Sequence, residues 1–354
     1  MSPLKNKFVL IIGAGQAGLA MAFRLKEKNI PFIVVSADNR IGDTWRKRYA
    51  SLTLFTPREL SALPGLKLKG AADNYPTRDE FADYLEQYAS YFDFPIRLGI
   101  AVVELKKKII SGQFLAVLSD GTEIVASHVI VATGGFQDPK IPTQAHHFSK
   151  TIKQFTPDTV GDMHTVPEGT VLVVGDGASG RDIALDLAST HSVLLATGKP
   201  RNLLPEYILG RSVWWWLNRL GLLKASSLSM IGKMLRSKDP IPNRNRDLPY
   251  LAKKGVKIMP RLVSVNNDIA KFENSALEKV TSIVWAIGYK DNMAWINIPN
   301  AFGAKGEVLH SKGISPIEGL YFIGRPWQRN RASALIMGAG EDAIFIRQHL
   351  NTEN

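Results

Sequence analysis

The stretch FVLIIGAGQAGLAMAFRLKEKNIPFIVV, residues 8–35, decides how the first part of the chain folds. It opens with a short apolar run of the kind that forms a buried parallel strand. A glycine-rich turn follows, then a helical pattern to about Lys28 and a second apolar strand at 32–35. Strand, turn, helix and strand within about 30 residues predict one βαβ unit.

The turn itself has the spacing GxGxxG, which is typical of dinucleotide binding. Gly13 permits the tight turn, Gly15 lets the backbone approach a pyrophosphate, and Gly18 lets helix and strand pack closely. The pyrophosphate would meet free amides at the helix N-terminus, so Gln16 and Ala17 belong to the predicted site. An acidic residue usually grips the ribose after the second strand. Here Ser36 holds that place and Asp38 follows two residues on, so both are candidates for the ribose contact.

A second βαβ pattern follows at residues 171–196, VLVVGDGASGRDIALDLASTHSVLLA, and predicts a second nucleotide. Its fingerprint comprises Gly175, Gly177, Ala178, Ser179 and Gly180. After its second strand stand Thr197, Lys199 and Arg201 in place of an acid. Cations there suit a ribose 2′-phosphate, which favours NADPH over NADH without excluding NADH. The alternative is a solvated basic loop.

Composition narrows the function classes. The chain has 354 residues and no cysteine, so a disulfide framework, a thiolate metal site and a redox CxxC are excluded. The seven histidines form no ligand spacing and GxSxG is absent, so we predict no metal and no serine hydrolase. The net charge of +12 favours anionic partners; we interpret it as that of a basic, soluble, cytoplasmic enzyme that does not bind nucleic acid.

Residues 207–250 form an insertion that neither nucleotide unit requires. It contains Trp214, Trp215 and Trp216, with leucines and several lysines and arginines around them. One interpretation is a helical cap over an apolar substrate passage. The other is an amphipathic helix lying on anionic lipid, because tryptophan with basic residues is typical of such helices. The cap is the favoured interpretation, and membrane contact stays open.

Further motifs extend the pattern along nearly the whole chain. They are GDTW at 42–45, LTLFTP at 52–57, ATGG at 132–135, AIGY at 286–289, GLYFIG at 319–324 and PWQR at 326–329. With the two fingerprints, they resemble the class B flavin-containing monooxygenases, especially the short bacterial and YUCCA-like members.

The resemblance implies FAD on the first fingerprint and NADPH on the second. It places Gly42, Thr44 and Trp45 against the FAD, Val102 beside its adenine, and Thr133 and Gly134 near its phosphates. Gln328 and the amides of Ser333 and Ala334 would face the flavin ring, at the N-terminus of a closing helix. Trp45, Phe55, Trp327 and Gln328 are the expected lining of the flavin cavity.

The implied fold is α/β, with two Rossmann-like dinucleotide-binding domains. An FAD domain would comprise residues 1–142 and 282–354. An NADPH domain would occupy residues 161–281 as an insert, with a hinge around 144–157.

The implied reaction is oxygenation of a small, largely apolar substrate by O2 through a flavin C4a-hydroperoxide. It would be an N- or S-oxygenation or a Baeyer-Villiger oxidation. The family's FxGxxxH segment should fall at 148–154, where Lys150 replaces the glycine and Gln154 the histidine. The alternatives are therefore an NAD(P)H oxidase or flavin reductase that releases hydrogen peroxide, and a membrane-associated flavin-binding sensor. The substrate and the oligomeric state stay open.

Overall fold

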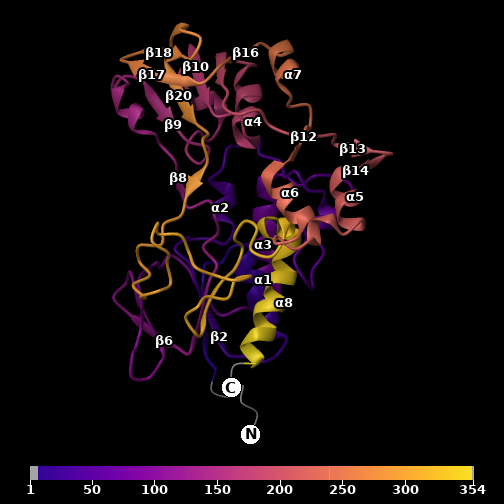
Figure 1. Cartoon of the computed structure of the whole chain (residues 1–354), viewed down its shortest axis with the longest axis vertical. Coiled ribbons are helices and arrows are strands. Elements are labelled where there is room, and N and C mark those ends of the chain that lie inside the picture. The colour runs from indigo at the N-terminus through magenta and orange to yellow at the C-terminus, as the bar shows by residue number, and fades with distance from the viewer. Residues whose placement is uncertain (1–6, 239, 353–354) are drawn as a thin grey trace.

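A computed structural model describes residues 7–238 and 240–352, and these residues form two lobes joined by a narrow waist (Figure 1). The first lobe holds both ends of the described chain and the second is built from its middle. A smaller helical subdomain projects beside the waist. The predicted α/β fold with two Rossmann-like domains is confirmed.

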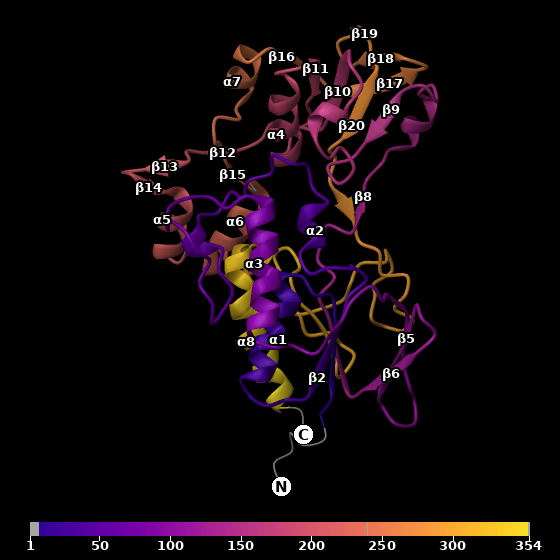
Figure 2. The same cartoon turned by 180° about the vertical axis from the view of Figure 1, so that it is seen from behind.

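The first lobe contains a parallel five-stranded sheet in the order β22-β7-β1-β2-β3. These strands are β1 (Val9–Ile12), β2 (Phe32–Val35), β3 (Ile96–Arg97), β7 (His128–Val131) and β22 (Leu320–Phe322). Helix α1 (Gln16–Lys26) lies between α3 (Arg78–Tyr91) and α8 (Ile336–Thr352), as the view from behind shows (Figure 2). The capping box of Thr77 and Glu80 that starts α3 follows from the sequence TRDE.

The second lobe repeats this plan in a sheet of order β16-β11-β10-β20-β9. Its strands are β9 (Lys153–Phe155), β10 (Thr170–Val174), β11 (Ser192–Ala196), β16 (Val256–Met259) and β20 (Ser282–Trp285), with helices α4 (Ala178–Leu187) and α7 (Leu248–Lys253). The predicted boundaries at 161 and 281 are wrong for two strands. Both β9 and β20 pair inside the second sheet, because β20 is hydrogen-bonded to β10 on one side and to β9 on the other.

Each lobe also has a three-stranded antiparallel sheet, which lies between β3 and β7 in the first lobe and between β16 and β20 in the second. In the first lobe this sheet consists of β4 (Val102–Lys107), β5 (Phe114–Leu118) and β6 (Glu123–Ala126). In the second it consists of β17 (Leu262–Asn266), β18 (Ile269–Phe272) and β19 (Leu277–Lys279). From the βαβ unit to the strand after the small sheet, the two lobes share one order of elements, but the outermost strand differs: β9 comes before this series and β22 comes after it.

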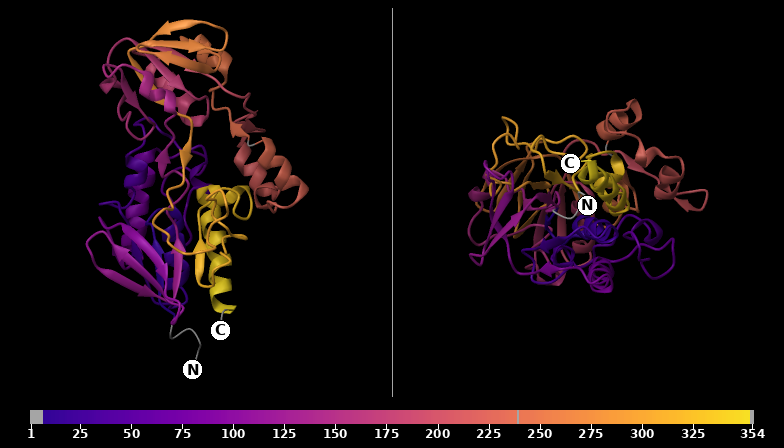
Figure 3. Two further views of the ribbon diagram at one scale, coloured as in Figure 1. Left: turned by 60° about the vertical axis from the view of Figure 1, so that its left-hand side comes forward. Right: turned by 90° about the horizontal axis from the view of Figure 1, so that it is seen from below.

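Two crossings join the lobes, and the strands β8 (Asp138–Pro139) and β21 (Tyr289–Lys290) pair there antiparallel. The insertion leaves the second lobe through the pair β12 (Leu203–Leu204) and β15 (Ile241–Pro242). It contains β13 (Tyr207–Ile208), β14 (Arg211–Ser212), α5 (Val213–Arg219) and α6 (Met230–Lys238), and it projects from the body in both views of Figure 3. The remaining short elements are α2 (Asp43–Arg46) and the 3-10 turns η2 (Arg58–Leu60), η3 (Thr143–His147), η4 (Met163–Thr165), η5 (Leu222–Lys224) and η6 (Arg331–Ala334).

The two glycine-rich turns have the same geometry. A Cβ atom on Gly18 would lie 1.9 Å from the carbonyl oxygen of Gly13, and one on Gly180 would lie 1.8 Å from that of Gly175. Backbone packing within the fold therefore requires glycine at the third position of each motif. The middle glycines, Gly15 and Gly177, have no atom within 4 Å of such a Cβ among the described residues. Their outer side is free for a ligand.

This difference predicts that two alanine substitutions in one turn affect the stability of the protein differently. Gly180→Ala should destabilise the protein by about 1–3 kcal/mol, because the added methyl group forces α4 away from β10. Gly177→Ala should leave the melting temperature unchanged, since the space beside it is open. Thermal unfolding of both variants checks this. Equal melting temperatures would contradict the packing argument.

Candidate active site

One cavity of about 1190 Å³ runs between the lobes and is bordered by both glycine-rich turns. The first turn contributes Gly13, Gly15, Gln16 and Ala17, and the second contributes Gly175, Gly177, Ala178 and Ser179. Gly18 and Gly180 are outside this described lining, as their packing requires. In both lobes the turn follows the carboxyl end of the first strand, where open α/β sheets bind ligands. A nucleotide on each turn would therefore occupy the same cavity.

The structure places most of the residues predicted around FAD in this lining. Ser36, Asp38, Thr44, Trp45, Val102, Thr133 and Gly134 all border the cavity. Ser36 is buried, whereas the Asp38 carboxylate accepts hydrogen bonds from Thr44 Oγ1 at 2.8 Å and Lys47 Nζ at 2.7 Å. Gly42 stays outside the described lining, with its α-carbon against Ala82 of α3 at a φ of +89°. Both ribose candidates, Ser36 and Asp38, remain available.

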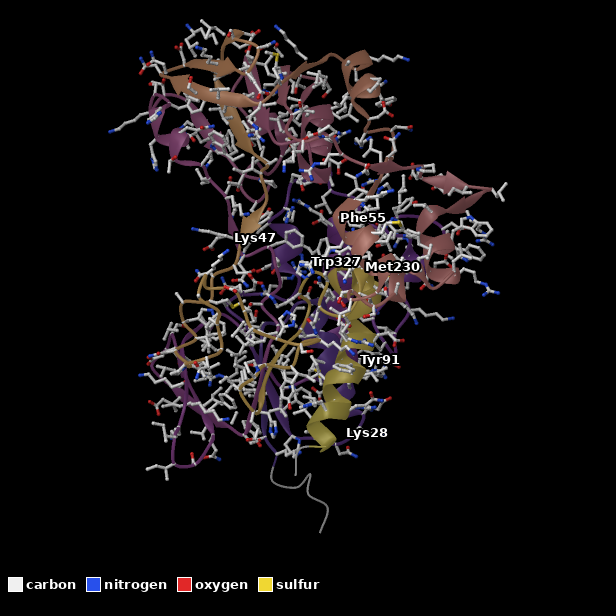
Figure 4. The ribbon with its side chains drawn as sticks, viewed as in Figure 1. Lys28, Lys47, Phe55, Tyr91, Met230 and Trp327 are labelled. Atoms are coloured by element: carbon white, nitrogen blue, oxygen red, sulfur yellow. The ribbon has the colours of Figure 1, made fainter. Side chains whose placement is uncertain are left out.

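The residues expected to face the flavin ring divide into two groups. Phe55 lines the cavity, and Trp45 does so while its indole donates to Gln16 Oε1 at 3.3 Å. Figure 4 shows Phe55 and Lys47 at the level of the waist. Trp327 and Gln328 are outside the described lining. The Gln328 amide is buried, donates to the Lys312 carbonyl at 3.4 Å and accepts from the Arg325 amide.

The start of the closing helix also differs in detail from the expectation. Ser333 is buried in the turn η6, where its hydroxyl accepts from the amides of Arg329 and Asn330. Ala334 ends that turn, and only its backbone is described. Leu335 and Ile336, at the first turn of α8, border the cavity instead. Helix α8 itself begins at Ile336, three residues after Ser333.

In the second lobe, three cations border the cavity where the ribose substituent of the second nucleotide would lie. Lys199 and Arg201 are two of them, beside Thr197, whose hydroxyl donates to the Met259 carbonyl. Arg261, after β16, is the third, and the sequence analysis missed it because it lies 60 residues after Arg201. The end of β11 lies beside the end of β16, which brings these side chains together. The buried carboxylate of Asp176 is paired with Arg181 at 3.1 Å and is 3.9 Å from Arg201.

A second group missed by the sequence analysis connects the lobes across the cavity. Residues 48–51 of the first lobe lie along one face of α4. Arg48 donates to Ser179 Oγ at 3.2 Å, Tyr49 to Asp182 Oδ2 at 3.0 Å, and Ser51 to Asp186. Burial raises the pKa of the Tyr49 phenol, so it stays protonated and acts as a donor.

Arg48 has the most connected position in this group. Its guanidinium pairs with Asp158 at 3.2 Å and lies over the Tyr289 ring at 5.1 Å. Tyr289 in turn donates to Asp158 at 2.9 Å, and burial raises the pKa of its phenol. All these residues line the cavity beside the second fingerprint. The cation is therefore available to a phosphate at the N-terminus of α4.

Removing the cations of the second lobe should alter cofactor selection. Lys199→Ala, Arg201→Ala and Arg261→Ala should each raise KM for NADPH about tenfold, since a charge-assisted contact to phosphate contributes about 1.5–3 kcal/mol. KM for NADH, which lacks the 2′-phosphate, should change little. Steady-state kinetics with both cofactors measures this. An unchanged NADPH preference in all three variants would assign these residues to a solvated loop.

Arg48→Ala should affect both nucleotide binding and the contact between lobes. We expect a higher KM for NADPH and slower flavin reduction, because the cation no longer connects Asp158 with the turn at Ser179. Lys47→Ala is the matched control: its ammonium contacts Asp38 in the first lobe only. Anaerobic reduction by NADPH, followed by flavin absorbance, separates the two variants. Equal rates of flavin reduction in the two variants would mean that Arg48 has no specific part in nucleotide binding or in the contact between the lobes.

Comparison with known proteins agrees with these observations. Residues 10–205 match the family described as pyridine nucleotide-disulphide oxidoreductase. The chain is 43% identical to the CzcO-like oxidoreductase of Geobacillus kaustophilus, over 96% of each chain. It is 28% identical to the probable indole-3-pyruvate monooxygenase YUCCA1 of Arabidopsis thaliana, covering 95% of this chain and 88% of that protein. The flavin-containing monooxygenase of Stenotrophomonas maltophilia has the same fold, with a TM-score of 0.77, 20% identity and 97% of each chain covered.

The family match confirms the predicted oxidoreductase with a pyridine nucleotide cofactor, and the relative and the solved structure agree with the predicted resemblance to class B flavin monooxygenases. More than half of the chain lies within the matched range. The chain therefore belongs to the pyridine nucleotide-disulphide oxidoreductase family.

Proposed function

We propose that the protein is an NADPH-using, FAD-dependent monooxygenase that oxygenates a small, largely apolar substrate. The observation that carries the proposal is the single cavity bordered by two complete nucleotide turns. When bound, the flavin would accept a hydride from NADPH and activate O2, so that one oxygen atom passes to the substrate and the other leaves as water. The chain has no cysteine, so the disulfide chemistry named in the family description has no thiol here.

The residues of the first lobe fit FAD. The open side of Gly15 and the amides at the start of α1 suit a pyrophosphate, and Ser36 or Asp38 suits the ribose. Leu335 and Ile336 bring the N-terminus of α8 to the cavity wall. A helix N-terminus stabilises nearby negative charge, as on a reduced ring system. In the second lobe, Gly177 and the cation group fit NADPH in the same way.

The insertion supplies an apolar wall beside this space, which supports the cap interpretation. Trp214 of α5 is buried and stacks on Phe55, with ring centroids 5.6 Å apart. Trp214 also packs in a cluster with Val213, Leu223, Ala332 and Leu335. Because Phe55 and Leu335 both line the cavity, the wall would exclude water and favour an apolar substrate. Amines, sulfides and ketones all fit this description.

The altered segment at 148–154 gives little support to the oxidase alternative. Gln154 lies in β9, where it donates to the Ala145 carbonyl and accepts from the Trp285 indole at 2.9 Å each. Lys150 is exposed, and neither residue is among the described residues that line the cavity. Both residues thus lie in the second lobe, away from the described cavity lining. The sensor alternative also loses support, since a sensor needs no second nucleotide turn.

Reoxidation of the reduced enzyme tests the proposal. The protein would be reduced anaerobically with NADPH and mixed with oxygenated buffer, while flavin absorbance and peroxide are recorded. We expect a delay before the oxidised flavin spectrum returns, and little peroxide during the delay. Immediate reoxidation with one peroxide per NADPH would favour the oxidase.

Two neighbouring tryptophans provide a matched pair of variants. Trp214→Leu should shorten the delay and raise the peroxide yield, since it opens the wall at Phe55. Trp215→Leu should not, because Trp215 is outside that cluster and packs against Trp216 and Arg211. Retained flavin absorbance shows that each variant is folded. Equal peroxide yields from the two variants would mean that the wall at Phe55 does not affect the reaction with oxygen.

A further inference from the structure

The outer surface of the insertion is unusually apolar. Of 19 large apolar side chains exposed among the described residues, eight lie within residues 207–238. Leu209 is 87% exposed, Leu228 74% and Met230 88%. We call the exposed side of residues 207–238 the outer face. Scattered exposed apolar residues are ordinary, but a concentration of this kind marks an interaction site.

All charged side chains of the same segment are positive. Residues 207–238 contain six lysines and arginines and no aspartate or glutamate. Two of the cations are paired with other segments, Arg211 with Asp73 at 3.2 Å and Lys224 with Glu341 at 3.6 Å. Arg219, Lys233, Arg236 and Lys238 are exposed and have no ion pair with a residue in the described ranges. Apolar side chains are thus interleaved with cations that have no acidic neighbour on the segment.

The cap does not use these residues. Its buried contacts come from Val213, Trp214 and Leu223, on the side that faces the body. Met230, Lys233 and Met234 of α6 all remain exposed. Figure 3 shows the segment projecting beyond both lobes, so a broad surface can reach it. The outer face therefore needs a partner other than the substrate cavity.

We propose that the outer face binds the surface of a membrane that contains anionic lipid. Apolar side chains would enter the headgroup region, and the cations would meet lipid phosphates. Trp215, Trp216 and Tyr207 are the residue types that favour this boundary. The net charge of +12 would add long-range attraction. The contact is peripheral: no helix within residues 7–238 and 240–352 is long and apolar enough to cross a membrane.

The test is co-sedimentation of the flavin-loaded protein with two kinds of vesicle. One kind contains equal parts of phosphatidylglycerol and phosphatidylcholine, and the other contains phosphatidylcholine alone. We expect binding to the first kind only, weakened by salt because the cations act through charge. Absence of binding to the anionic vesicles at low salt would overturn the proposal.

Two double variants separate the apolar and electrostatic contributions. Leu228→Ser with Met230→Ser should abolish sedimentation with anionic vesicles. Lys233→Glu with Arg236→Glu should weaken binding on the order of thirtyfold or more, since each basic residue near such a surface contributes about a factor of five. NADPH oxidation in solution should be unchanged in both, because neither pair lines the cavity.

Matched controls use the far end of the first lobe. Ile109→Ser with Ile110→Ser removes two fully exposed apolar side chains from the β4–β5 turn. Lys28→Glu with Lys108→Glu makes the same change in net charge, and Figure 4 shows Lys28 far from Met230. Both controls should bind anionic vesicles nearly as the original protein does. Equal losses in each control and its test variant would mean that binding does not depend on the outer face, and would overturn the proposal.

A second copy of the protein could also cover the outer face, and the experiment must distinguish this dimer from membrane binding. Analytical ultracentrifugation without vesicles would compare the original protein with the Leu228→Ser, Met230→Ser variant. A dimer that dissociates in the variant, with no vesicle binding by either protein, would assign the outer face to a second copy and overturn the proposal. The outcome does not depend on the reaction, because a peroxide-releasing oxidase would bind vesicles equally well.

Discussion

The contact between the first and third glycines of each turn is the constraint on which the rest of the structure depends. Because Gly18 and Gly180 have no side chain, the first turn of each helix can pack directly against the carbonyl group of the first glycine in its motif. That contact fixes the direction of α1 and α4 and leaves the middle glycine facing open space. Since both helices start at the same edge of their sheets, both N-termini face the cavity. Packing at these four glycines therefore sets where the two helix N-termini meet the cavity.

Two similar lobes make one site only if they are held at a fixed separation. The antiparallel pair β8–β21 limits that separation, and residues 48–51 add contacts along α4. The hydrogen bond of Tyr49 is buried, whereas Arg48 is partly exposed and borders the cavity. A bound phosphate would compete with Asp158 and Ser179 for the Arg48 guanidinium, and this competition would couple the contact between the lobes to occupancy of the second turn.

Local sequence patterns predicted the parts of this fold that local physics determines. The two βαβ units and their glycine-rich turns each depend on residues close in sequence. The strand β9 and the placement of β20 depend on pairing across more than 100 residues, so the domain boundaries were wrong there. Arg48 and Arg261 were missed for the same reason. No motif marks a residue whose role comes from the approach of another segment.

The insertion shows why one sequence feature allowed two interpretations. In the sequence, its tryptophans and cations are compatible with either a cap or a membrane helix. The structure divides them: Trp214 is buried against Phe55, while Leu209, Leu228 and Met230 are exposed. A buried tryptophan and an exposed methionine contribute equally to a hydrophobic count, although only the second can contact a membrane. The two interpretations therefore use different residues, so one insertion can both wall the cavity and present a surface to a membrane.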